Sequence, residues 1–340
     1  MKVSIGYKIE SGPWGGGNRF VSNLQKELEL NGHNVVFDLF DPDIDILLVI
    51  NPRYRRNPNV TFGAGKILNY LMFRNPEAIV VHRINECDER KNTTGLNFKL
   101  RVMNYLADHT LFVASWLINL NLWRSESSHS VLLNGADQEI FFSTGENVWN
   151  KKRPLRLVTH HWGGNLLKGF DVYGHIDLLL DDHKWSSKIE FTYIGSLPKG
   201  YKFKNVKHIK PLTGKELAHH IRKNDVYLTA SINEPSGNHH IEGACCGLPL
   251  LYRNSGGLPE YCEGFGIEFE GVSDIEEKLN LMINSYEDLR KKMPKYPNTS
   301  TNRTPEFVRL FEVLYSNRKK VSNSRKIWRN PFMLILNVFL

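Results

Sequence analysis

The chain has 340 residues with 41% hydrophobic and 24% charged side chains, a balance typical of globular proteins with room for two domains. Its formal net charge of +8 favours anionic partners, but no helix-turn-helix, zinc-finger or RNA-recognition pattern is present, so we expect no nucleic-acid partner. Four cysteines without C-x2-C spacing argue against a disulfide framework, and no apolar run is long enough to span a membrane. The start MKVSIGYKIE lacks the apolar core of a signal peptide, so we expect a cytoplasmic protein.

Short apolar runs alternate with helical patterns through the first half of the chain. Residues 3–9 predict a strand, the glycine-rich segment 12–18 a turn, and the next segment a helix with apolar residues at the helical period. NVVFDLF, DILLVI, AIVVHRI, TLFVAS and SVLLN then follow as runs typical of buried parallel strands. This alternation predicts an α/β domain with a doubly wound sheet, which we place at residues 1–150.

The polar stretch 143–154 predicts a linker, after which the same pattern starts again. LRLVTH, FTYIG, DVYLTA and PLLYRN predict the strands of a second doubly wound domain, which we place at residues 151–305. Residues 306–340 predict a helix and a tail that has no acid after Glu312, several basic residues and the apolar end IWRNPFMLILNVFL. Such a tail suits an anionic membrane surface, and packing back onto the protein is the alternative.

The segment EPSGNHHIEGACCGLPLL places two acids, Glu234 and Glu242, on either side of a turn and a helix start. Pro235 and Gly237 favour a turn, and Gly237 lets backbone N–H groups approach a ligand closely. A helix that begins near Asn238 directs its unpaired N–H groups and positive dipole end at this turn, which favours a phosphate. The two carboxylates could then hold hydroxyl groups of a nucleotide-sugar on either side of its diphosphate.

This segment, together with SGGLPEYC at residues 255–262, resembles the donor-binding segment of retaining glycosyltransferases of the GT-B fold, family 4 type. The resemblance implies two Rossmann-like domains that face each other across a cleft, with the acceptor on the first and the donor on the second. It implies transfer of a sugar from a nucleotide-sugar to a saccharide or lipid-linked acceptor with retention of configuration, in polysaccharide or glycolipid biosynthesis. It implies neither a metal nor another cofactor.

The resemblance also assigns roles to residues. Lys168 and Glu234 are expected to be catalytic, with Lys168 neutralising the departing diphosphate and Glu234 holding sugar hydroxyls. The expected donor-binding residues are Gly16, Gly17, His161, Asn165, Pro235, Gly237, Asn238, His239 and Glu242. The family has an arginine five residues before the lysine, and this chain has Gly163 there, which puts stabilisation of the leaving group in doubt. His160, His161 and Asn165 are the candidate replacements.

The segment HRINECDER ends a predicted strand of the first domain, and open α/β sheets form their sites at the carboxyl ends of strands. The resemblance makes His82 a third catalytic candidate, with a structural histidine as the alternative. The expected acceptor-side residues are Asn18, Arg83, Asn85 and Glu86.

Three other functions fit parts of the sequence. A sugar-nucleotide epimerase can share the GT-B fold. A nicotinamide enzyme would use the glycine run 15–17 with Asp38, although that run lacks the G-x-G-x-x-G spacing. A non-catalytic GT-B module that binds sugar or membrane would explain Gly163. Adjacent histidines do not share a helix face, so neither histidine pair predicts a metal site. We expect a cytoplasmic location that extends to the inner face of the membrane.

Overall fold

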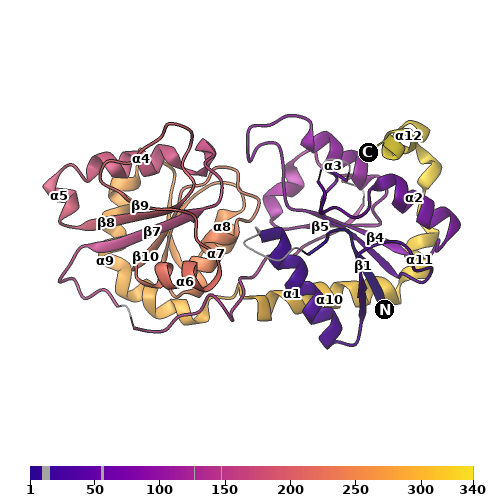
Figure 1. The fold of residues 1–340 in the computed structure, drawn as a ribbon, viewed down its shortest axis with the longest axis horizontal. Helices are drawn as coiled ribbons and strands as arrows, with labels where there is room; N and C mark the ends of the chain where they lie inside the picture. The colour runs from indigo at the N-terminus through magenta and orange to yellow at the C-terminus, as the bar shows by residue number, and fades with distance from the viewer. Residues whose placement is uncertain (10–15, 55–56, 126, 147, 340) are drawn as a thin grey trace. The chain divides into compact units, whose positions relative to one another are not determined.

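The computed structural model describes residues 1–9, 16–54, 57–125, 127–146 and 148–339. The contacts within it divide the chain into two compact units, unit 1 with Met1–Asn134 and Asn302–Leu340, and unit 2 with Gly135–Thr301. Each unit has a six-stranded sheet with helices packed against it (Figure 1). Every strand pair is parallel, so the predicted α/β class with two doubly wound sheets is confirmed.

Unit 1 has the strand order β2-β1-β3-β4-β5-β6. Its strands are β1 (Lys2–Ile5), β2 (Asn34–Val36), β3 (Ile46–Val49), β4 (Ile79–Ile84), β5 (His109–Phe112) and β6 (Ser128–Val131). Its helices are α1 (Gly16–Leu30), α2 (Ala64–Phe73), α3 (Leu96–Asn104) and η1 (Ser115–Asn119), followed near the C-terminus by α10 (Ser300–Ser316), α11 (Arg318–Asn323), η4 (Ile327–Arg329) and α12 (Pro331–Phe339).

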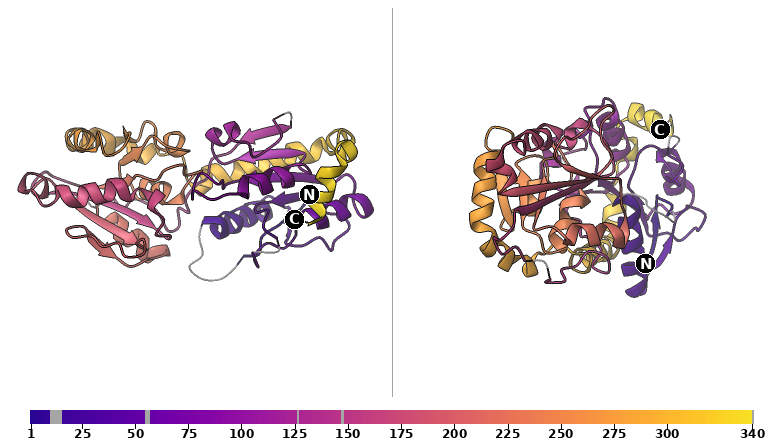
Figure 2. Two further views of the ribbon diagram at one scale, coloured as in Figure 1. Left: turned by 90° about the horizontal axis from the view of Figure 1, so that it is seen from above. Right: turned by 60° about the vertical axis from the view of Figure 1, so that its left-hand side comes forward.

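The sheet of unit 1 has an apolar core on each face, because neighbouring residues of a strand point to opposite sides. On one face Ile46 and Val81 pack in a cluster with α1 and with Phe311 of α10. On the other face Leu47 packs in a cluster with α2 and with Leu334 of α12. The C-terminal helices therefore belong to the core of unit 1, as the yellow segment beside the indigo and purple helices shows in Figures 1 and 2.

Unit 2 has the strand order β12-β11-β10-β7-β8-β9. Its strands are β7 (Leu155–His161), β8 (Ile189–Gly195), β9 (Lys207–Ile209), β10 (Val226–Thr229), β11 (Leu250–Arg253) and β12 (Gly266–Phe269). Its helices are η2 (Leu166–Lys168), α4 (Phe170–Leu179), α5 (His183–Ser186), α6 (Gly214–Arg222), α7 (Asn238–Cys245), α8 (Leu258–Cys262), α9 (Ile275–Lys292) and η3 (Met293–Lys295). Counted from β7, this is the 3-2-1-4-5-6 order of dinucleotide-binding folds, whose direction reverses between β7 and β10.

The predicted linker 143–154 lies in unit 2, so the division at Asn134 and Gly135 comes earlier than the boundary we predicted at residue 150. The reason is Trp149, which is 5% exposed and belongs to the main core cluster of unit 2. Its ring meets that of Tyr286 edge-on, with 5.5 Å between centroids. The polar composition of the stretch hides this one buried aromatic anchor.

Candidate active site

The predicted donor residues of unit 2 gather at the carboxyl ends of β7 and β10, which are neighbours in the sheet. Doubly wound sheets bind ligands at such a reversal, because the connections leave toward opposite faces and open a crevice between them. The β7–α4 connection carries Lys168, and the β10–α7 connection carries Glu234. The helix α7, which begins at Asn238 as predicted, carries Glu242.

Lys168 and Glu234 form an ion pair through Nζ and Oε2, with side chains only 14% and 3% exposed. Lys168 ends η2, where Asn165 serves as the N-cap and accepts a hydrogen bond from Leu167 N at 2.8 Å. The backbone N–H of Ile232 donates to Leu167 O at 2.8 Å and so joins the two connections. The structure thus brings together the two residues predicted to be catalytic in unit 2, and gives Asn165 a capping role.

The SGGLPEYC loop holds the backbone of Glu234 in place. Gly257 N donates to Glu234 O at 2.8 Å, and Ser255 Oγ accepts from Asn233 N at 2.9 Å. Gly256 has a φ of 61°, and a Cβ at this position would lie 2.6 Å from Glu234 O. Glycine is required here because a side chain would force the loop away from the acid.

Glu242 is 4% exposed and faces a histidine that comes from β7. Its Oε2 lies 2.9 Å from Nε2 of His160, and the Nδ1 of His160 lies 2.9 Å from the hydroxyl of Tyr227. Gly243 lets α7 approach this group, since a Cβ there would lie 2.2 Å from the ring of Tyr227. From the sequence, His160 was expected only as a replacement for the arginine, because no local pattern signals its contact with Glu242.

Burial keeps two histidines of this region, His161 and His239, neutral. Burial is the largest cause that lowers the pKa of His161 and His239 well below the ordinary value, and the charge of Lys168 adds to it. His161 Nε2 lies 2.9 Å from the hydroxyl of Tyr173, while His239 Nε2 lies 2.8 Å from Thr229 Oγ1. Neutral rings with polar partners cannot supply the charge of an arginine to a diphosphate.

Position 163 remains open, although its neighbour is closely packed. A Cβ at Gly163 would meet no atom within 4 Å, whereas a Cβ at Gly164 would lie 2.3 Å from Leu197 O. On the α7 side, Pro235 is buried, and Gly237 adopts a φ of 59° directly before the helix. The turn and helix start predicted from the sequence are therefore present, without the arginine.

The predicted glycine-rich site of unit 1 is described only in part. Gly16, Gly17 and Asn18 form the first turn of α1, which follows β1. Residues 10–15, including Gly15, lie outside the described residues. The strand order of unit 1 reverses between β2-β1 and β3-β4, so the start of α1 lies beside the reversal, where a ligand is expected.

His82 and Arg83, predicted as a catalytic and an acceptor-side residue, are buried on opposite faces of β4. His82 has no exposed surface, its Nδ1 lies 3.3 Å from Asn104 Nδ2, and burial lowers its pKa to about 3. Arg83 is 2% exposed and lies over the ring of Phe20 at 3.8 Å. Consecutive residues of a strand covered on both faces point into two cores. The structural alternative for His82 is therefore favoured, and neither side chain presents a surface to an acceptor.

Glu86 lies beyond the end of β4 and is partly exposed, as is Asn85. Its carboxylate contacts Arg53, and Lys91 Nζ lies 3.0 Å from its Oε1. Burial alone would raise the pKa of Glu86, but the charges of Arg53, Lys91 and Arg90 outweigh it and lower the pKa. Glu86 is thus a charged group at the carboxyl edge of the sheet in unit 1.

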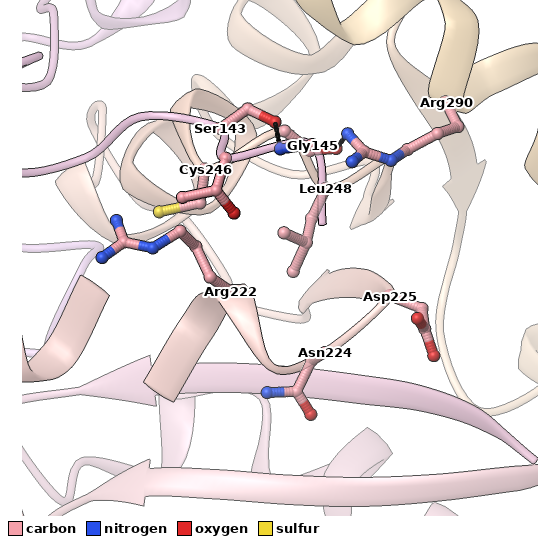
Figure 3. A pocket seen from close by; sticks show the side chains of 10 residues that line it. Ser143, Gly145, Arg222, Asn224, Asp225, Cys246, Leu248 and Arg290 are labelled. Carbon is pink, nitrogen blue, oxygen red and sulfur yellow. Dashed lines mark hydrogen bonds between the residues drawn. The ribbon is translucent and has the colours of Figure 1, made fainter. Parts of the chain in front are cut away.

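A small pocket lies elsewhere in unit 2 (Figure 3). Its lining includes Ser143, Arg222 and Arg290 but no predicted donor residue. Arg290 donates to Gly247 O, and Arg222 donates to Ile140 O at 3.3 Å. Arg222 thus attaches the segment that enters unit 2 to α6, while Arg290 attaches α9 to the turn after α7. Among the described residues, no group of three or more histidines, cysteines or acids is placed to hold a metal ion.

Comparisons with known proteins match a segment of the sequence and the overall fold. Residues 199–298, which include Glu234 and Glu242 but not Lys168, match the family model for glycosyl transferases group 1. No curated protein sequence matches the chain. Solved structures of glycosyltransferases share the fold at low identity, and their superposition confirms the predicted GT-B fold.

Three of these structures illustrate the likeness. Sucrose-phosphate synthase from Thermosynechococcus elongatus has a TM-score of 0.63 at 12% identity, over 93% of this chain and 99% of that one. HepE from Anabaena in complex with UDP has a TM-score of 0.67 at 12% identity, over 92% and 100%. HepE in complex with UDP-glucose has a TM-score of 0.59 at 13% identity, over 95% and 99%.

Proposed function

We propose that the chain is a glycosyltransferase that moves a sugar from a nucleotide-sugar to a saccharide or lipid-linked acceptor. The observation that carries the proposal is that the two acids of the donor segment, Glu234 and Glu242, each contact a side chain from the β7–α4 region. Lys168 contacts Glu234 and His160 contacts Glu242 at the strand-order reversal of unit 2. The group 1 match and the GT-B fold support the same activity.

In this proposal each described group has one task. Glu242, oriented by His160, accepts hydrogen bonds from the ribose hydroxyls. Glu234 accepts hydrogen bonds from sugar hydroxyls near the reacting carbon. Lys168 and the N–H groups at the start of α7 stabilise the diphosphate as its charge develops on departure. The donor would have to share Lys168 with Glu234, since the two side chains pair before it binds.

The finer points of the proposal come from the family resemblance. We assign the chain to the family 4 type, with retention of configuration and without a metal or other cofactor. The acceptor would belong to polysaccharide or glycolipid biosynthesis and would bind unit 1 near Asn18, Asn85 and Glu86. HepE binds UDP and UDP-glucose, so UDP is the first nucleotide to test. We place the reaction in the cytoplasm at the inner face of the membrane, as the basic and apolar tail favours.

Nucleotide binding provides the first test. The purified protein would be unfolded thermally with UDP, GDP, ADP, dTDP, CMP or NAD, in parallel with Glu242→Gln and the control Glu190→Gln, an exposed acid of β8. A ligand at about 100 times its Kd adds about 2.7 kcal/mol to the unfolding free energy. We expect one nucleoside diphosphate to stabilise the wild type and the control but not Glu242→Gln. Stabilisation by NAD alone would overturn the proposal in favour of a nicotinamide enzyme.

Sugar transfer provides the second test, with Lys168→Ala and Glu234→Ala assayed on the nucleotide-sugar selected above. We expect each substitution to lower kcat by at least about a hundredfold, because removing one preorganised hydrogen-bonding group from a transition state costs this much. Full activity of both variants would exclude the site. Product analysis without an acceptor separates transfer from epimerisation. Nucleotide binding without turnover would favour the non-catalytic module, which Gly163 supports.

A further inference from the structure

The helix α12 presents apolar side chains to the outside and its only polar side chain to the inside. Its sequence is PFMLILNVF, and the single polar residue, Asn337, has no exposed surface. Phe332, Ile335 and Phe339 are 66%, 56% and 69% exposed, and Val338 is exposed as well. These four residues, which we call the outer stripe, follow one side of the helix at spacings of three and four. A helix that meets water has the opposite arrangement.

Side chains on the inner side of α12, opposite the outer stripe, hold the helix on unit 1. Asn337 Nδ2 donates to Val102 O at 2.9 Å, while Leu334 is buried in the core cluster beneath α2. Before the helix, the hydroxyl of Tyr105 donates to Ile327 O at 2.9 Å, and Arg329 lies over the ring of Tyr105 at 4.0 Å. The exposure of the stripe is therefore a consequence of specific contacts on the other side of α12.

Exposed cations and an aromatic residue lie next to the outer stripe in sequence. Trp328, in the turn η4 before α12, is 69% exposed. Lys319 and Lys320 of α11 and Lys326 are exposed, and no acid follows Glu312. Two basic residues of the tail differ, because Arg325 is buried in a pair with Asp108 and Arg318 is partly buried and pairs with Glu77. A second copy of the chain would bring the same cations together, whereas an anionic lipid surface would neutralise them.

We propose that the outer stripe and Trp328 dock unit 1 onto the surface of an anionic lipid bilayer. The helix α12 would lie in the plane of the interface with its apolar side chains among the upper acyl chains, and the lysines would face the headgroups. No helix among the described residues is long and apolar enough to cross a bilayer. This surface would account for the membrane location proposed above. Lipid binding is measured without donor or acceptor, so the docking proposal does not depend on sugar transfer.

Co-sedimentation of the full chain with vesicles tests the inference. The vesicles would contain phosphatidylcholine alone, or phosphatidylcholine with about 30% phosphatidylglycerol to make the surface anionic. The test variant is Phe332→Ser with Ile335→Ser and Phe339→Ser, and the control is Leu178→Ser on α4 of unit 2, which is 67% exposed. We expect the wild type and the control to bind the anionic vesicles, and the triple variant to bind at least about tenfold more weakly, because each apolar side chain adds to membrane partition.

Charge and depth are tested separately. Lys319→Ser with Lys320→Ser should weaken binding to the anionic vesicles by about fivefold for each charge removed, and high salt should have the same effect. Trp328 fluorescence, taken as the difference between wild type and Trp328→Phe, should shift to the blue with anionic vesicles. Equal vesicle binding by wild type and triple variant would overturn the proposal. So would a wild-type dimer in solution that the triple variant converts to a monomer, because the stripe would then be an interface between copies.

Discussion

Placing an arginine at Gly163 should strengthen binding of the nucleoside diphosphate. Position 163 is exposed on the connection that leads from β7 to Lys168, and a side chain there would meet no atom within 4 Å. The backbone does not require glycine, because φ at this position is not positive. The substitution therefore adds a guanidinium to the proposed diphosphate site at little cost in packing. Lys168, the cation already present on this connection, forms an ion pair with Glu234.

The expected gain follows from the value of a charge-assisted hydrogen bond, about 1.5–3 kcal/mol. Because position 163 is exposed, we take the lower end, which corresponds to about a tenfold lower Kd. Isothermal titration with the nucleoside diphosphate that stabilises the wild type measures this change. Gly163→Gln controls for side-chain length, and the nucleoside without phosphates should show no gain. An unchanged Kd for Gly163→Arg, or an equal gain for Gly163→Gln, would refute the placement of the diphosphate beside this connection.

Two further predictions concern stability. Gly164→Ala should lower the unfolding free energy in urea by about 1–3 kcal/mol, because its Cβ would lie 2.3 Å from Leu197 O, while Gly163→Ala should be neutral or slightly stabilising. Equal effects at the two positions would contradict this packing. Burial lowers the pKa of His240 from 6.5 to about 3, so below pH 6.5 the unfolded chain binds a proton that the folded chain does not. Folding stability should thus fall by about 1.4 kcal/mol per pH unit for this residue as pH decreases, and His240→Leu should remove that part of the slope in urea unfolding at pH 7 and pH 5. An unchanged slope would show that His240 is not held neutral.

Local patterns in the sequence determined the fold class and the donor segment. Apolar runs separated by helical segments predicted two doubly wound sheets, since each run must be buried on both faces. The turn at Pro235 and Gly237 and the start of α7 at Asn238 followed from residues whose backbone preferences act over a few positions. Lys168 and Glu234 were both chosen from short motifs, and the structure places them in contact.

Only the tertiary structure decided which distant groups meet. The contact between His160 and Glu242 requires β7 and β10 to be neighbours, an order that no local pattern fixes. The burial of His82 depends on α3, which covers the face of the sheet into which this residue of β4 points.

The tertiary structure also decided how two segments of ambiguous composition pack. Trp149 lies in a polar stretch and nevertheless anchors it in unit 2 through Tyr286. Every residue of α12 except Asn337 is apolar, so the sequence could not say which side would pack and which would be exposed. The hydrogen bond from Asn337 to Val102 O, in the last turn of α3, turns the polar side inward, because a buried amide gains a partner there while apolar side chains have no such directional preference.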